Sequence, residues 1–215
     1  MSKKKSVLLI RASISMSLAL VLTGCQSHKT QTATIASPSI SVTQPAVATT
    51  SVPVAAPAAS VTPVSQTVVR IKAGASSTFT DASGNVWAAD QGFSGGDTIE
   101  RPDISITNAV EPGIYRSEHY GMNSFSWPLT NGKYLVKLHF AETFEGIEGP
   151  GQRVFSFSVQ GHEFKDFDVW VKAGGPFKAY VETVPVEITD GKLLISFTSN
   201  VENPQINGIE IIPQT

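Results

Sequence analysis

The amino-acid sequence predicts an all-β domain over residues 67–215, built as a sandwich or a barrel of antiparallel strands. Three observations lead to this fold class. Apolar and polar residues alternate with a period of two, short turn sequences separate the alternating segments, and no stretch keeps a helical period over three turns. Many short strands with regular turn signals are typical of β-sandwiches and β-barrels. A domain of this length buries enough apolar surface to fold without a disulfide bond.

The alternating segments also predict which side chains face the core. In a half-buried strand, every second side chain points to the same face of the sheet. Further strands are expected at residues 184–188, 193–197 and 206–212. The side chains expected on the core face of the two clearest strands are Tyr134, Val136, Leu138 and Phe140 in residues 133–140, and Phe155, Phe157 and Val159 in residues 154–159.

Three dipeptides predict tight hairpin turns between these strands. Asn131-Gly132, Gln160-Gly161 and Asp190-Gly191 each separate two alternating segments. Such pairs adopt the positive backbone angles that a two-residue hairpin requires.

The first 24 residues have the organisation of a secretory signal peptide. A cationic start with Lys3, Lys4 and Lys5 precedes an apolar segment whose best part covers residues 16–22, which is shorter than the roughly 20 apolar residues of a membrane-spanning helix. The segment ends in Leu-Thr-Gly-Cys, and this sequence resembles the bacterial lipobox. The resemblance implies cleavage before Cys25 and lipidation of its thiol. The alternative is an ordinary signal peptide that contains a cysteine.

Cys25 is the only cysteine of the chain, and lipidation accounts for an unpaired cysteine in an exported protein. Gln26 follows it, and by resemblance to the enteric sorting pattern this favours a lipid anchor in the outer membrane. The domain is then expected to face the periplasm or the cell surface.

Residues 25–66 are expected to form a lipidated cysteine followed by a disordered or extended linker. The segment is rich in Ser, Thr, Pro and Ala, has Lys29 as its only charged residue, and contains no aromatic residue. A segment without bulky apolar side chains does not compensate the entropy cost of ordering its backbone. A structured β-rich segment is the alternative.

The charge of the domain argues against nucleic acid as a partner. Five of the 16 Lys and Arg residues precede residue 66, whereas all 18 Asp and Glu residues follow it, which leaves 11 basic residues and a net charge of −7 in the domain. Affinity for nucleic acid comes largely from Lys and Arg that neutralise phosphates.

Aromatic residues in predicted loops are candidates for ligand contacts. Tyr115 and Tyr120 lie five residues apart in a segment where irregular backbone is expected, and both can face solvent. An exposed tyrosine stacks on the apolar face of a sugar and donates a hydrogen bond through its hydroxyl group. The alternative is that one of the two is a core or corner residue. Phe144 lies beyond the end of a strand, as a surface platform or as a lid on the core, whereas Phe140 is expected in the core.

The acidic residues of the same loop do not predict an enzyme. A glycosidase interpretation is suggested by the carboxylates of Glu142, Glu145 and Glu148. It requires two carboxylates at a defined separation, whereas charged loop residues are usually solvated. No serine nucleophile motif and no phosphate-binding glycine loop occurs. No cofactor or metal is predicted, since His119 and His139 have no zinc-ligand spacing, while calcium stays open because oxygen ligands are plentiful.

Several segments, in their order and spacing over residues 69–213, resemble the malectin domain and related carbohydrate-binding modules. They are Ile71-Lys72-Ala73-Gly74, Trp87-Ala88-Ala89-Asp90, Phe93-Ser94-Gly95-Gly96, Ile114-Tyr115-Arg116-Ser117-Glu118-His119-Tyr120-Gly121, Leu138-His139-Phe140-Ala141-Glu142, Arg153-Val154-Phe155, Val159-Gln160-Gly161 and Asn203-Pro204-Gln205-Ile206-Asn207-Gly208-Ile209-Glu210-Ile211.

This resemblance implies a jelly-roll-like β-sandwich whose loops at one end bind oligosaccharides. Three positions differ from the family pattern: Thr143 and Gln91 replace aromatic residues, and Glu202 replaces an aspartate. Fewer stacking platforms imply a different sugar, weaker binding or a role without sugar. Carried over by motif, the ligand-binding residues are Asp90, Tyr115, Tyr120, Phe144, Glu202 and Asn203.

The sequence therefore predicts a membrane-anchored, non-catalytic protein that recognises an oligosaccharide or polysaccharide through loop aromatics and acidic residues. The alternative is a structural or protein-interaction module of the cell envelope, which keeps the fold without binding sugar and has an envelope protein as its partner.

Overall fold

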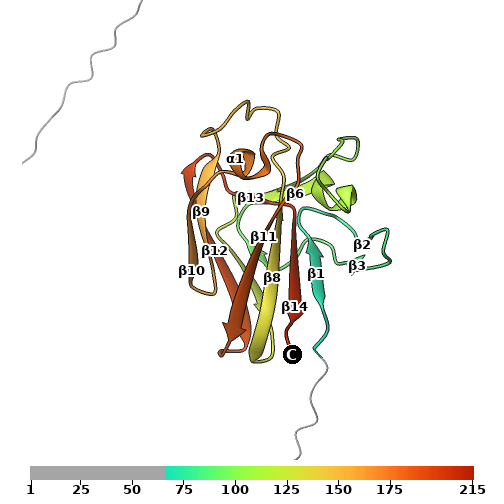
Figure 1. Ribbon diagram of the computed structural model, residues 1–215, viewed down its shortest axis with the longest axis vertical. Helices are drawn as coiled ribbons and strands as arrows, with labels where there is room; N and C mark the ends of the chain where they lie inside the picture. Colours follow the sequence, from blue (N-terminus) through green and yellow to red (C-terminus); the bar gives the residue numbers. More distant parts are fainter. Residues whose placement is uncertain (1–65) are drawn as a thin grey trace, which may run out of the picture. The chain divides into compact units, whose positions relative to one another are not determined.

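The computed structural model describes residues 66–215 (Figure 1). The predicted signal peptide, the predicted lipidation at Cys25 and almost all of the predicted tether lie outside the described residues. The elements, in chain order, are β1 (Val69–Lys72), β2 (Phe79–Thr80), β3 (Val86–Trp87), β4 (Phe93–Ser94), β5 (Asp97–Glu100), the 3-10 helix η1 (Pro112–Arg116), β6 (Ser117–Tyr120), β7 (Ser124–Pro128), β8 (Gly132–Phe140), β9 (Val154–Val159), β10 (His162–Phe167), α1 (Val169–Ala173), β11 (Tyr180–Ile188), β12 (Lys192–Val201), β13 (Gln205–Ile206) and β14 (Gly208–Pro213).

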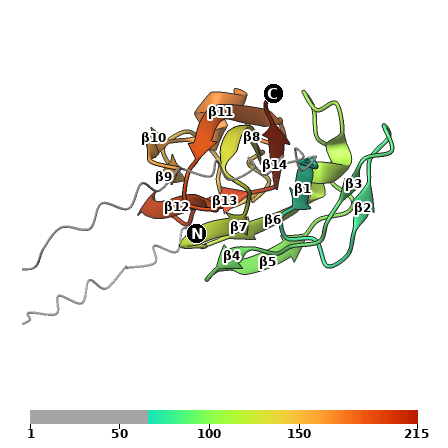
Figure 2. The same ribbon diagram turned by 90° about the horizontal axis from the view of Figure 1, so that it is seen from below.

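Two antiparallel sheets form the two layers of a sandwich. One has the strand order β1-β14-β8-β11 and the other the order β10-β9-β12-β7-β4. Viewed along the strands, the two sheets lie one above the other (Figure 2). Two small sheets, β13-β6-β5 and β2-β3, complete the fold. The prediction of an antiparallel β-sandwich is confirmed. Neither helix of residues 66–215 is long and apolar enough to cross a membrane.

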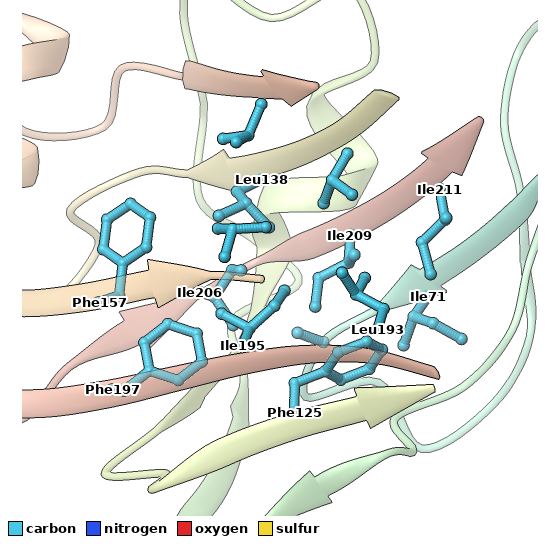
Figure 3. Packing of buried hydrophobic residues seen from close by; sticks show 14 of the residues in the cluster. Ile71, Phe125, Leu138, Phe157, Leu193, Ile195, Phe197, Ile206, Ile209 and Ile211 are labelled. Carbon is cyan, nitrogen blue, oxygen red and sulfur yellow. The ribbon is translucent and has the colours of Figure 1, made fainter. Parts of the chain in front are cut away.

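The core lies between the two layers, and alternate residues of each strand fill it. Every side chain predicted to face the core from β8 and β9 is buried, from Tyr134 to Phe140 and from Phe155 to Val159. Figure 3 shows Leu138 and Ile209 of one sheet pointing toward Ile195 of the other. Each such side chain contributes about 1.5–3 kcal/mol relative to an exposed one, so this interface dominates the stability of the domain.

Only one of the three predicted hairpins is present. Gln160 and Gly161 both have positive φ, at 47° and 86°, and β10 pairs with β9 through them. The other two predictions are wrong, because Asn131-Gly132 connects β7 to β8 and Asp190-Gly191 connects β11 to β12, and each connection crosses from one sheet to the other. A turn dipeptide fixes local backbone angles, whereas the packing of the two layers decides which strand pairs with which.

The predicted last strand is interrupted at Asn207, and this interruption organises one end of the sandwich. The side chain of Asn207 is completely buried, accepts a hydrogen bond from the Ala141 backbone N–H at 2.7 Å, and donates one to the Ser117 carbonyl at 2.8 Å. The residues before it form β13, which pairs with β6. Asn207 therefore ties the end of β8 to the start of β6, next to the loops described below.

Candidate functional site

A cavity of about 210 Å³ opens at this end of the sandwich. Four chain segments far apart in the sequence contribute to it: the end of β5, the strand β6, the loop between β8 and β9, and the turn between β12 and β13. The lining residues are Ile99, Arg101, Glu118, Tyr120, Phe144, Arg153, Glu202 and Asn203. We refer to it as the Tyr120 pocket.

The short pairing of β13 with β6 brings the two walls of the Tyr120 pocket together. Gln205 lies opposite Tyr120 in this pairing, and the Gly121 N–H donates to the Pro204 carbonyl at 2.8 Å. Glu202 begins the turn with a positive φ of 63°, and its carboxylate accepts from the Asn203 side-chain amide at 3.2 Å. The turn therefore carries an exposed carboxylate to the rim beside the tyrosine.

One ion pair forms part of the floor. Arg101 Nη1 lies 3.1 Å from Glu118 Oε1, and the carboxylate of Glu118 is almost completely buried. Thr143 donates from its hydroxyl group to the second oxygen of Glu118 at 2.8 Å and accepts from Arg101 at 3.2 Å. Because both oxygens of Glu118 are occupied, this carboxylate is held in place and neutralised.

A second ion pair supports the exposed aromatic ring. Arg153 Nε lies 3.0 Å from Glu142 Oε2 without the alignment of a hydrogen bond, and Arg153 Nη1 donates to the Asn203 carbonyl at 3.2 Å. The guanidinium group is also 6.0 Å from the centre of the Phe144 ring, within the range of a cation–π contact. Burial raises the pKa of Glu142, while the Arg153 charge and the Phe144 N–H favour its ionised form.

The pocket thus combines an apolar platform with fixed polar groups. The side chain of Phe144 is 46% exposed, although a lone phenylalanine in a loop normally packs against a core. Tyr120 is half-buried at the opposite wall, and Glu202 is exposed. The two arginines are paired with carboxylates, so Glu202 is the lining carboxylate without a paired cation among residues 66–215. This combination suits a ligand with an apolar face and hydroxyl groups.

Four of the six residues proposed from the sequence meet in this pocket: Tyr120, Phe144, Glu202 and Asn203. The interpretation of Phe144 as a surface platform, and of Phe140 as a core residue, agrees with their exposure. The other two proposed residues lie elsewhere.

The expectation that both tyrosines face solvent is wrong for Tyr115. Its side chain is 3% exposed and packs in a small apolar cluster with Trp87 and Ile114. Its hydroxyl group lies 3.0 Å from His139 Nδ1, and burial raises its pKa. The physical reason is η1, whose single turn directs Tyr115 inward, whereas Tyr120 is the last residue of the extended strand β6.

Asp90 lies beside the pocket, where its carboxylate links the backbone at Gly74 to the side chain of His119. Its carboxylate accepts from the Gly74 N–H at 2.6 Å and lies 2.9 Å from His119 Nδ1. It lines a neighbouring hollow that shares only Ile99 with the Tyr120 pocket.

Three further residues complete the pocket that sequence motifs do not identify as functional: Arg101, Glu118 and Arg153. No spacing in the chain relates these residues, because each pairs with a partner brought close by the fold. Within residues 66–215, no group of three His, Cys, Asp or Glu side chains is placed to hold a metal ion.

The Malectin domain family matches residues 67–209, which is more than half of the chain. The chain belongs to the malectin domain family. Among curated relatives, Malectin-B of Xenopus laevis is 31% identical over 96 residues, covering 43% of this chain and 34% of the frog protein. The kinesin-like protein KIN-14E of Oryza sativa subsp. japonica is 30% identical over 151 residues, covering 66% of this chain and 14% of the rice protein. This malectin domain chain therefore spans at most about a third of the curated relatives that it matches.

Solved structures share the malectin-like sandwich at low sequence identity. A β-glucuronidase of Bacteroides uniformis superposes with a TM-score of 0.63 at 18% identity, over 69% of this chain and 18% of that enzyme. The structure of the plant peptide RALF23 in complex with FER and LLG2 gives a TM-score of 0.59 at 19% identity, over 68% of this chain and 48% of that one. These similarities establish the fold of the domain.

Proposed function

We propose that this malectin domain is a non-catalytic carbohydrate-binding module, and that the Tyr120 pocket is its sugar site. The observation that carries the proposal is the exposed Phe144 ring, which faces the same cavity as Tyr120 and Glu202.

The geometry assigns a role to each side chain. The Phe144 ring stacks on the C–H face of a sugar, with Arg153 fixing the ring from the buried side. Tyr120 and Glu202 then hydrogen-bond hydroxyl groups at the edge of the same sugar. The volume of about 210 Å³ lies below the usual range of drug-sized pockets, so we expect a shallow site with modest affinity for one sugar unit.

The ion pairs support a binding role over a catalytic one. A glycosidase requires two carboxylates that are free to donate a proton and to attack or activate water. Glu118 is occupied by Arg101 and Thr143, and Glu142 by Arg153 and the Phe144 N–H. Both carboxylates therefore serve to position the walls of the pocket.

Our proposal for location rests on the sequence. Lipidated Cys25 anchors the mature protein to the outer membrane, and residues 26–66 present the domain to envelope glycans in the periplasm or at the cell surface. Palmitate labelling of cells, followed by membrane fractionation, tests this anchor. Label that persists in Cys25→Ser, or wild-type protein in the soluble fraction, contradicts it.

Isothermal titration of the chain from residue 26 onward against an oligosaccharide panel tests the sugar site. We expect binding to at least one neutral oligosaccharide, and a clearly lower affinity in the double variant Tyr120→Ala/Phe144→Ala. An unchanged affinity in this variant assigns the sugar to another surface. Release of reducing sugar from any panel member contradicts the non-catalytic role.

The second candidate is a protein-interaction module of the cell envelope. Thr143 and Gln91 supply no aromatic platform, and a malectin-like fold occurs in the FER complex with a peptide. Cross-linking in intact envelopes tests it: a defined protein partner, together with no response across the glycan panel, favours this candidate over the first.

A further inference from the structure

The domain contains a second and larger hollow, of about 600 Å³, that shares no lining residue with the Tyr120 pocket. It lies between the outer face of β8, β11 and β14 and two loops, residues 81–85 and 108–115. Its floor includes Tyr115, which the Tyr120 pocket does not use.

A chain of hydrogen bonds crosses the floor of this hollow. The Tyr115 hydroxyl group lies 3.0 Å from His139 Nδ1, His139 Nε2 lies 3.1 Å from Glu210 Oε1, and Arg70 Nε donates to Glu210 Oε2 at 3.1 Å. The His139 hydrogen bond lowers the pKa of Glu210, so its carboxylate is ionised and accepts. Nε2 of His139 therefore donates to Glu210, and Nδ1 is partnered by the Tyr115 hydroxyl group. The floor is thus rigid, with every member partnered.

The acidic groups of the walls are also satisfied from within the domain. Asp81 accepts from the Asn85 side chain at 2.9 Å and from Trp87 Nε1 at 3.1 Å. Glu111 accepts from the backbone N–H groups of Ala82 and Gly113. Both carboxylates are therefore fixed by neutral donors, and the Lys137 ammonium group adds a positive charge to the same lining.

The remaining lining groups are open to a ligand. The side chains of Asn108, Lys137 and Thr183 line the hollow, and none makes a hydrogen bond to another residue of 66–215. Next to them are two apolar side chains, Val110, which is fully exposed, and Val181, which is 38% exposed. Asn108 is held at a positive φ of 57°, a conformation in which few side chains other than Asn, Asp and Gly are comfortable. Amide, hydroxyl and ammonium groups beside small apolar side chains match a neutral ligand with many hydroxyl groups and C–H faces.

We propose that this hollow is a second glycan-binding site, which takes a neutral sugar unit and makes the domain bivalent. This inference rests on the proposed function, since it gives the second hollow the same class of ligand. Two sites on one rigid body raise the affinity for a polymer above that of either site alone.

Nuclear magnetic resonance of the chain from residue 26 onward, titrated with a neutral oligosaccharide bound by the wild type, tests the proposal. The titration is performed on Tyr120→Ala/Phe144→Ala, in which the first site is removed.

We expect saturable shifts of the His139 ring signals and the Thr183 methyl signal. We expect the shifts of the His139 ring signals to disappear when Asn108→Gly and Thr183→Val are added. Asn108→Gly tolerates the positive φ, and Thr183→Val keeps the shape of the side chain. Thr198→Val, on the exposed face of β12 in the other sheet, is the matched control.

The outcomes separate the two proposals. Wild-type shifts confined to Tyr120, Phe144 and their neighbours overturn the second site and leave the proposed function intact. No shift at either hollow with any glycan overturns the proposed function itself. Shifts at His139 that saturate with a neutral peptide but with no glycan assign the hollow to a protein partner and overturn the glycan proposal. For the matching polysaccharide, we expect the Asn108→Gly/Thr183→Val variant to bind at least about tenfold more weakly than the wild type.

Discussion

Arg153 Nε lies 3.0 Å from Glu142 Oε2, and both side chains are at least 95% buried. Each of these groups has lost its hydration, so each depends on the other for compensation. Because Arg153 also contacts the Asn203 carbonyl and the Phe144 ring, the same pair joins the two ends of the β8–β9 loop to the turn between β12 and β13.

Removing one member of this pair is expected to destabilise the domain strongly. Arg153→Met leaves the Glu142 charge buried without a partner and should cost about 3–5 kcal/mol in the free energy of unfolding. The double variant Arg153→Met/Glu142→Gln should cost clearly less than the sum of the single variants. Urea denaturation of the four proteins checks this, and additive costs would show that the pair is not coupled.

Removing the Phe144 ring is expected to weaken sugar binding and to spare the fold. Because the ring is 46% exposed, Phe144→Ala removes little buried surface, whereas loss of stacking should lower the affinity about tenfold, or 1.4 kcal/mol. Leu194→Ala is the matched control, since Leu194 is 44% exposed on β12. Titration calorimetry and thermal melting measure the two effects, and equal affinity for Phe144→Ala and the control removes the ring from the site.

His119 is expected to make stability depend on pH. Burial lowers its pKa, but the hydrogen bonds with Asp90 and the Gly95 carbonyl outweigh burial and raise it above 6.5; Asp97 adds in the same direction. A raised folded-state pKa gives stability that is fully present below pH 6.5 and is lost as the pH rises through the folded-state pKa. Only the protonated imidazole donates from both ring nitrogens, to the Asp90 carboxylate and to the Gly95 carbonyl, and it thereby ties the loop at Gly95 to β6.

We therefore expect the free energy of unfolding to fall as the pH rises above 6.5, as the imidazole loses its proton. His119→Gln should show a smaller fall. An equal pH dependence in the wild type and in His119→Gln would assign the effect to another group.

Tyr115→Phe is expected to affect stability without changing the Tyr120 pocket. The substitution removes the hydroxyl group that hydrogen-bonds His139 Nδ1 and leaves that buried nitrogen without a partner, at a cost of about 1–2 kcal/mol. The Phe144 ring signals should respond to the sugar as in the wild type. A weaker response there would return Tyr115 to the first site, where its predicted loop position and the family resemblance place it.

Two glycine positions differ only in their surroundings, which allows a controlled test of backbone packing. Gly74 and Gly84 both have positive φ, at 76° and 81°, but a Cβ at Gly74 would overlap the backbone of Glu118, while a Cβ at Gly84 meets open space. Gly84→Ala should cost about 1 kcal/mol from φ alone, and Gly74→Ala clearly more because β6 must move. Equal costs in urea denaturation would show that β6 moves freely.

The sequence predicts the layers of this fold better than its connections. Alternation in β8 and β9 identifies the core face correctly, because period two is a property of each strand alone. The pairing of strands depends on contacts between distant segments. The turn sequences at Asn131 and Asp190 therefore predict hairpins, although the strands on either side of each turn belong to different sheets.

The candidate site follows the same division. Tyr120, Phe144 and Glu202 are recognisable from motifs, because the loop sequences that present them are local. Motifs do not identify Arg101 and Arg153. Their ion-pair partners, Glu118 and Glu142, are separated from them in the sequence and are brought close only by the fold. Tyr115 was misplaced because one 3-10 turn reverses the direction of its side chain, which residue type does not reveal.

The pairing of β1 with β14 has a mechanical consequence. Val69 pairs with Ile211, so the chain enters the sandwich beside its C-terminus, at the end opposite the Tyr120 pocket (Figure 1). A pull between a bound glycan and the N-terminal segment would therefore run along the strands. In that direction the hydrogen bonds between β1 and β14 are loaded together, as in shear, instead of opening one after another. The domain is thus oriented to resist tension between its N-terminal end and the loops at the opposite end of the sandwich.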